Sequence, residues 1–294
     1  MTGRPRIRAV AASLTAQSPP WRADPEELLY LRDLYAPFGV PIHKEELRSG
    51  GATSHRDLVR SALDAAPAAA EAARHADLVV VASGLPDLHP FAPVGPYVQR
   101  RLGSPGLGFT VSGQGSAAPF TAMRIASVFQ SAGRARKAVV VIVEQETHPV
   151  PFEAPHRHRV KAADGCVLLV LDGDEEADGA GEARVEEVTR VRADSLGRGA
   201  ELLADAVSRH TKDIGSGEAL VVLGPHVPQD LRVPDTATVH RVHRPGYGTG
   251  VWLELAERHV EWAAYRRIVL CEADGRRPGH ADLLSLSGGV ARTR

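Results

Sequence analysis

The sequence predicts an α/β fold made of two similar halves, and three observations support this prediction. The quartet Gly113–Ser116 in the first half is matched by Gly246–Thr249 in the second. A helix-like stretch follows each quartet and leads into an apolar run that ends in glutamate, at Glu144 in one copy and Glu272 in the other. Short continuous runs of Val, Leu and Ile are typical of strands buried on both faces, which favours mostly parallel sheets covered by helices.

The elements of the first copy can be assigned in chain order. A short apolar run predicts a first strand, and Ser54 is a plausible N-cap for the helix that comes next. Val- and Ile-rich runs predict the later strands, and helical spacing predicts the segments between them. The expected ranges are 9–14 (strand), 58–73 (helix), 76–81 (strand), 94–102 (helix), 109–111 (strand), 120–129 (helix), 139–144 (strand) and 164–171 (strand).

The second copy repeats this series with a helix and three strands that have counterparts in the first. The acidic, Gly-rich stretch 172–182 separates the copies, so we predict an N-terminal half at 1–174 and a C-terminal half at 175–294. Residues 18–50 have no counterpart and are expected to form an insertion over the mouth of a site. The expected ranges of the second copy are 200–210 (helix), 218–223 (strand), 268–272 (strand) and 282–286 (strand).

Composition narrows the possible partners. With 294 residues and 43% hydrophobic content, the chain can bury a large core. Its formal charge of −1 provides no positive field for nucleic acid or for an anionic membrane surface, so we predict neither as a partner. No apolar run approaches the roughly 18 residues that span a bilayer, and the arginines at the N-terminus precede only a short apolar stretch. We therefore expect a cytoplasmic protein.

Neither redox chemistry nor a metal is predicted. Cys166 and Cys271 fall inside predicted buried strands, where cysteine usually behaves as a small hydrophobic residue. Nothing in the sequence indicates disulfides or an oxidising compartment. His156 and His158 have His-x-His spacing, but no cysteine or acidic cluster completes a recognisable metal site.

The pattern Gly-x-Gly-Ser-Ala between the strand 109–111 and the helix 120–129 predicts a strand-turn-helix elbow. The sharp turn places the side chain of Ser116 at a helix N-terminus, among backbone N–H groups. There the serine either caps the helix or acts as a nucleophile. As a nucleophile it needs a general base, because a helix terminus supplies at most about 2 of the roughly 12 kcal/mol needed to ionise a hydroxyl at pH 7.

Histidine is the usual base, and His226 has the most suitable position among the 13 histidines. It follows the apolar run 220–223, and open α/β sheets bind ligands outside the carboxyl ends of their strands. We therefore expect Ser116 and His226 to share a cleft to which both halves contribute, although a histidine in this place can also be purely structural. His148, just beyond Glu144, is a second candidate base or an orienting group.

These features together resemble the thiolase-like superfamily, specifically the ketoacyl synthase III branch, which condenses acyl-CoA starters with malonyl-carrier protein. The resemblance covers nearly the whole chain at low identity, with a shortened second half. It implies a five-layered α-β-α-β-α fold that dimerises through the central sheets, with CoA or phosphopantetheine as substrate carrier and no other cofactor. The matching stretches are 76–90, 102–103, 109–111, 132–133, 138–144, 163–166, 225–226, 247–249 and 283–289.

The chain departs from the family at the nucleophilic cysteine. Counting back from Gly133 along the helix places Ser116 at the cysteine's position, whereas counting forward from Phe109 places Gly115 there. Gln114 is a third possibility for the cysteine's position. A glutamine there resembles the arrangement in condensing-enzyme partners, in which glutamine replaces the cysteine and condensation is lost. We favour Ser116, with a loop one residue longer than in the family.

The family's catalytic histidine corresponds to His226, but its two asparagines are missing. Residues 227–229 are Val-Pro-Gln where the family pattern has an asparagine, and Thr249 replaces the second asparagine, which the family has in a Gly-Asn turn. An asparagine and a histidine together stabilise the enolate that forms when a malonyl group is decarboxylated. Ordinary Claisen condensation is therefore not expected.

The leading hypothesis is acyl transfer without carbon–carbon bond formation. Ser116 takes an acyl group from a CoA or acyl-carrier-protein thioester and passes it to a hydroxyl, amine, thiol or water. His226 acts as the base, Thr249 or His148 orients it, and backbone N–H groups hold the oxyanion. The other residues expected in the nucleophile or oxyanion loops are Gln114, Gly115 and Gly248.

Two alternatives stay open. The chain can be a catalytically silent, chain-length-factor-like partner of an active ketosynthase, or a malonyl decarboxylase. The enzyme hypothesis predicts a homodimer and the partner hypothesis predicts a heterodimer. Polyketide or fatty-acid-like specialised biosynthesis is the expected setting in either case.

Overall fold

The computed structural model of the chain describes residues 4–14, 20–22, 24–42, 44, 47, 51–148, 162–173 and 183–288. Its strands form one ten-stranded sheet in the order β3-β2-β4-β5-β1-β6-β10-β9-β7-β8. Counted outward from the central β1–β6 pair, the two halves have equivalent orders, β1-β5-β4-β2-β3 and β6-β10-β9-β7-β8. The first half contributes β1 (Arg6–Leu14), β2 (Leu78–Ser83), β3 (Leu107–Ser112), β4 (Lys137–Glu144) and β5 (Gly165–Asp172). The second half contributes β6 (Ala183–Arg192), β7 (Ala219–Leu223), β8 (Ala237–Arg241), β9 (Arg267–Ala273) and β10 (His280–Ser287).

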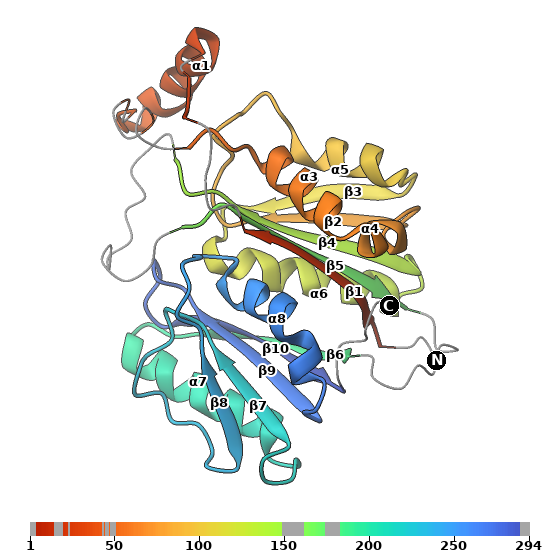
Figure 1. The fold of residues 1–294 in the computed structure, drawn as a ribbon. Coiled ribbons are helices and arrows are strands. Elements are labelled where there is room, and N and C mark those ends of the chain that lie inside the picture. The colour runs from red at the N-terminus through yellow and green to blue at the C-terminus, as the bar shows by residue number, and fades with distance from the viewer. Residues whose placement is uncertain are drawn as a thin grey trace.

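Helices lie outside both halves of the sheet and between them, which gives the predicted five layers (Figure 1). Three helices cover the outer face of the first half, two lie between the halves, and one covers the outer face of the second. In that order they are α3 (His55–Ala65), α4 (Pro67–Ala72) and α5 (Val94–Leu102), then α6 (Ala118–Ser131) and α8 (Gly250–Trp262), then α7 (Leu196–Thr211). The predicted α/β fold with a thiolase-like layered architecture is therefore confirmed.

The buried residues form three large clusters that match these layers. The central cluster combines α6 and α8 with the inner faces of both halves, and the tilted ring contact between Phe120 and Trp252 joins the two helices within it. A second cluster lies under α3, α4 and α5, and a third lies under α7. Because the strands face helices on both sides, their apolar runs are continuous rather than alternating.

The prediction of mostly parallel sheets is wrong. β2 pairs in parallel with β3 and β4, and β7 pairs in parallel with β8 and β9. The other pairings, including those of β5 and β10 with both of their neighbours, are antiparallel. A continuous apolar run reports burial on both faces and carries no information about strand direction, which explains the error.

The predicted helix at 58–73 is two helices. Pro67 begins α4, and Ala66 between the helices has φ −134° and ψ 71°, outside the helical region. Proline disfavours a helical residue before it and cannot donate the helical hydrogen bond, so the first helix ends there. Two strands, β6 and β8, were not predicted, because both expose polar side chains and lack a long apolar run.

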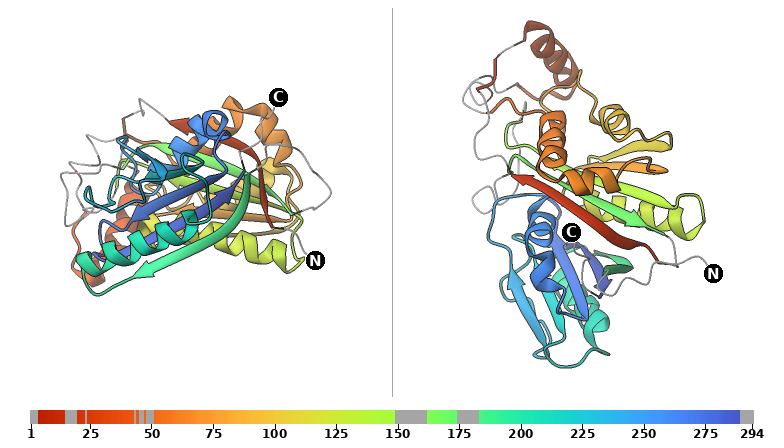
Figure 2. Two further views of the ribbon diagram at one scale, coloured as in Figure 1. Left: turned by 90° about the horizontal axis from the view of Figure 1, so that it is seen from below. Right: turned by 45° about the vertical axis from the view of Figure 1, so that its right-hand side comes forward.

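The predicted insertion closes at its base, where Pro20 and Gly51 form an isolated antiparallel bridge. It carries α1 (Pro25–Tyr35) and a 3-10 turn, η1 (Ala36–Phe38), and Figures 1 and 2 show α1 projecting beyond the sheet. Whether it covers the mouth of a site stays a prediction. The predicted boundary at 174/175 lies outside the described residues and also stays a prediction. No helix in the described part of the chain has the length and apolar character needed to cross a bilayer.

Candidate functional site

The first quartet forms the predicted elbow between β3 and a short 3-10 turn, η2 (Gly115–Ala117), that leads into α6. Gly113 and Gly115 adopt left-handed backbone conformations, with φ of 71° and 58°, which glycine reaches at little cost. Gly115 is the left-handed residue that begins the 3-10 turn. A Cβ atom added to it would collide with the hydroxyl of Tyr247 from the second half.

Ser116 is buried, with 3% of its surface exposed. Its hydroxyl donates a hydrogen bond of 3.3 Å to the backbone oxygen of Ala273, at the end of β9 in the other half. Its backbone N–H donates to the Tyr247 hydroxyl. Among the described residues, no hydrogen bond joins the Ser116 hydroxyl to an imidazole or to the backbone of its own helix. The side chain therefore links the two halves.

Tyr247 lies at the centre of this junction and is almost completely buried. Its hydroxyl donates to Asp274 Oδ1 at 3.0 Å. Burial and the charge of Asp274 both raise the pKa of Tyr247, so the side chain stays a neutral phenol. The ring meets that of His226 edge-on, with 5.4 Å between the ring centroids. Tyr247 thus contacts both Ser116 and His226.

His226 follows β7 and its side chain is buried. Its Nδ1 lies 3.4 Å from Glu272 Oε1, and its backbone N–H donates to the same oxygen. Burial alone would lower the pKa of His226, but Glu272, Asp274 and Glu144 together raise it. The imidazole is therefore paired with a carboxylate of its own half.

Glu144 is the last residue of β4, and its side chain forms hydrogen bonds with the backbone of the second quartet. Its buried carboxylate accepts hydrogen bonds from the backbone N–H groups of Tyr247 at 2.8 Å and Thr249 at 3.2 Å, and from Gly248. It also accepts from the N–H of Ala163 at 2.9 Å. Backbone N–H groups that lead into a helix can form an anion site, and here an internal carboxylate fills the one formed by residues 247–249, just before α8.

The remaining predicted site residues lie in different surroundings. Thr249 is fully buried, and its Oγ1 has no hydrogen-bond partner within the described ranges. Gln114 does not point freely into a cleft, because its side-chain oxygen accepts from Thr121, whose hydroxyl also accepts from Arg190 of β6. His156 and His158 lie outside the described residues, and the described ones contain no group of metal-binding side chains.

His148 belongs to a second buried cluster, next to the N-terminus of α3. It interacts electrostatically with His55, whose Nδ1 lies 3.6 Å from Asp87 Oδ2. Burial, assisted by His148, lowers the pKa of His55 to about 3. Burial also lowers the pKa of His148 to about 4 and raises that of Asp87 to about 6. This cluster therefore favours neutral side chains.

We expect His55 to make stability depend on pH. Its pKa falls from 6.5 in the unfolded chain to about 3 in the folded one, so its contribution is complete above pH 6.5 and is lost as pH falls toward 3. At pH 5 the loss is about 2 kcal/mol. Denaturant titrations at pH 7 and pH 5 measure it.

The comparison variant for this test is His55→Gln, which removes the titrating group. Asp87 acts in the opposite direction in both proteins, because its raised pKa favours folding at low pH. The difference between wild type and variant therefore isolates His55. Replacing the exposed His243 by glutamine should leave the wild-type pH dependence unchanged. A His55→Gln protein with that same dependence would contradict the assignment.

Sequence reasoning missed four residues whose side chains make the contacts around Ser116, His226 and the second quartet, namely Tyr247, Asp274, Glu144 and Glu272. The signal was present, because both copies place a glutamate directly after a long buried strand. A carboxylate at such a position has to find hydrogen-bond donors. Which donors it finds depends on the packing of the other half, which no local pattern reveals.

Comparisons with known proteins define the class of fold. FabH from Pseudomonas aeruginosa PAO1, a 3-oxoacyl-(acyl carrier protein) synthase III, has a TM-score of 0.63 and 17% identity, and the match covers 99% of this chain and 100% of that one. AbyA1, a tetronic acid condensing enzyme, has a TM-score of 0.62 and 18% identity, with 97% and 100% covered. The fold is that of the thiolase-like condensing enzymes.

A third structure is a variant of OleA from Xanthomonas campestris with bound lauric acid and lauroyl-CoA. It has a TM-score of 0.61 and 15% identity, with 98% of this chain and 100% of that chain covered. No protein-family profile and no curated protein sequence matches the chain. At these identities the likeness shows the fold alone.

Proposed function

We propose that this chain is a ketosynthase III-like protein of acyl-thioester biosynthesis that lacks a working nucleophile and serves as a silent partner subunit. One observation carries the proposal. At the elbow, Gly115 is the left-handed residue that begins the 3-10 turn, and the Tyr247 hydroxyl occupies the space into which a side chain there would project. A cysteine or serine cannot be accommodated at this position while Tyr247 stays in place.

The surroundings of the elbow support this proposal. The carboxylate of Glu144 takes up the N–H groups of residues 247–249, just before α8, so they are not available to an external oxyanion. Thr249 replaces the family's asparagine at a fully buried position, and its Oγ1 has no hydrogen-bond partner among the described residues. These arrangements stabilise the protein interior rather than a reacting thioester.

A silent subunit needs an active one. The proposed partner is a related, cysteine-bearing condensing enzyme, in a heterodimer that receives acyl groups from CoA or an acyl carrier protein. The resemblance to a family that dimerises through its central sheets favours this kind of assembly. In it, the chain would shape the pocket or the dimer of the active enzyme.

The second candidate is acyl transfer through Ser116 in a homodimer. It is favoured by the contacts of Tyr247, which bring Ser116 of one half and His226 of the other to the same side chain. The Ser116 oxygen would attack the thioester carbonyl and give its proton to His226, and the carbon–sulfur bond would break to release the thiol. An acceptor alcohol, amine, thiol or water would then take the acyl group. Tyr247 would have to move first.

Acyl labelling and co-purification separate the two candidates. Purified protein is incubated with radiolabelled acyl-CoA, and the Ser116→Ala protein is treated in parallel. The silent-partner proposal predicts no stable label on either protein and a stable heterodimer with a cysteine-bearing homologue expressed in the same cell. Label on the wild type that is lost in Ser116→Ala, together with a self-sufficient homodimer, would replace it with the transferase.

A further inference from the structure

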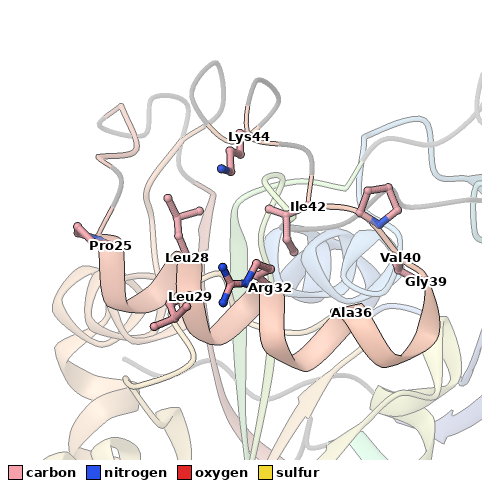
Figure 3. A pocket seen from close by; sticks show the side chains of 10 residues that line it. Pro25, Leu28, Leu29, Arg32, Ala36, Gly39, Val40, Ile42 and Lys44 are labelled. Carbon is pink, nitrogen blue, oxygen red and sulfur yellow. The ribbon is translucent and has the colours of Figure 1, made fainter.

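A groove lies between α1 and the chain that follows it. It has a volume of about 600 Å³ and an open side, and α1 forms one wall while residues 39–42 and Lys44 contribute the other (Figure 3). Figure 3 shows Leu28 projecting from the helix toward Lys44. None of the elbow residues lines it. The lining residues are Pro25, Leu28, Leu29, Arg32, Ala36, Gly39, Val40, Pro41, Ile42 and Lys44.

The lining has a definite chemical character. Its walls are aliphatic, and its two charged residues, Arg32 and Lys44, are both cations. The backbone N–H of Lys44 donates to the Ile42 oxygen, and within the described part of the chain no ion pair or hydrogen bond engages its side chain. Arg32 donates two N–H groups to the Asp33 carboxylate, but this ion pair is exposed to solvent and therefore contributes little. The groove thus combines an apolar surface with two cationic side chains, and Lys44 has no ion-pair partner among the described residues.

The helix is exposed on this side, which leaves the groove accessible. Leu29 lines it with 49% of its surface exposed, whereas Leu34, on the same helix and 44% exposed, does not line it. Leu31 is the buried residue that anchors α1. Contact with water at an apolar wall is unfavourable, so a ligand that covers Leu28 and Leu29 gains hydrophobic free energy.

We propose that this groove binds a long alkyl chain that ends in a carboxylate. The chain lies along the aliphatic wall, and the carboxylate pairs with the Lys44 ammonium and the Arg32 guanidinium. A neutral peptide segment would offer no counter-charge to the Lys44 ammonium, and a cationic amphiphile would be repelled. The proposal stands independently of the function proposed for the elbow, because the two sites share no residue.

Isothermal titration of the full chain with laurate, below its micelle-forming concentration, tests the proposal. One site per chain is expected for laurate, with no binding of acetate, which lacks the alkyl chain, or of dodecylamine, which carries the opposite charge. Equal binding of laurate and dodecylamine would show a purely hydrophobic surface and would overturn the proposal. So would a failure of laurate to bind.

Matched variants locate the site. Leu29→Glu should weaken laurate binding by about tenfold or more, because it places a negative charge on the apolar wall, whereas Leu34→Glu should leave it unchanged. Lys44→Gln should weaken binding about tenfold, whereas Lys212→Gln, at an exposed lysine of the other half, should not. Equal effects within either pair would place laurate elsewhere and overturn the proposal. Circular dichroism of each variant confirms that it is folded.

Discussion

Replacing Gly115 by alanine is expected to lower the free energy of unfolding by about 3 kcal/mol. A left-handed conformation costs an L-residue about 1–2 kcal/mol, and the new methyl group would also collide with the hydroxyl of a buried tyrosine. Tyr247 cannot retreat easily, because its hydroxyl is bonded to Asp274 and its N–H to Glu144. Denaturant unfolding of the purified protein measures the change.

Two control variants separate the collision from the backbone strain. Gly113 has a similar φ of 71°, but an added Cβ would meet no atom within 4 Å, so Gly113→Ala should cost only the strain of about 1–2 kcal/mol. In a Tyr247→Phe background, Gly115→Ala should also cost less, because the colliding oxygen is gone. If both glycine substitutions cost the same in the wild-type background, Tyr247 does not fill the elbow.

Replacing Glu144 by alanine is expected to cost about 4 kcal/mol. The substitution leaves four buried backbone N–H groups, those of Ala163 and of residues 247–249, without their acceptor. Each unsatisfied buried group costs about 1–3 kcal/mol, and entering water molecules recover part of that. The free energy of unfolding in urea is again the measurement.

Glu146 provides the matched control, because it is exposed and only two residues away. Glu146→Ala should change stability by less than about 0.5 kcal/mol. Glu144→Gln keeps one acceptor oxygen and should fall between wild type and alanine. A Glu144→Ala protein as stable as wild type would mean that the second quartet does not depend on the first half for its conformation.

The duplication and the layered architecture could be predicted because local sequence patterns indicate them. Both quartets, the buried runs and the strand-end glutamates are read directly from the chain. Strand direction could not be predicted, because β5 is buried on both faces like β2 although the two strands run in opposite senses beside β4. Burial decides the composition of a strand, while its direction follows from the connection that precedes it.

The site was predictable only in part. A strand-turn-helix pattern located the elbow, and the end of an apolar run located His226. The pattern could not tell which residue of the quartet carries the strained backbone, and it gave no reason to look at Tyr247. That side chain acts from the other half, so its place at the elbow depends on tertiary packing alone.

Among the described residues, β1 and β6 share two paired positions, Arg6 with Arg184 and Ile7 with Ala183, whereas β1 pairs with β5 along almost its whole length. The contacts that hold the two halves together therefore lie chiefly in the apolar layer around α6 and α8. A substitution in α6 or α8 would therefore affect both halves of the molecule, since both pack on these two helices.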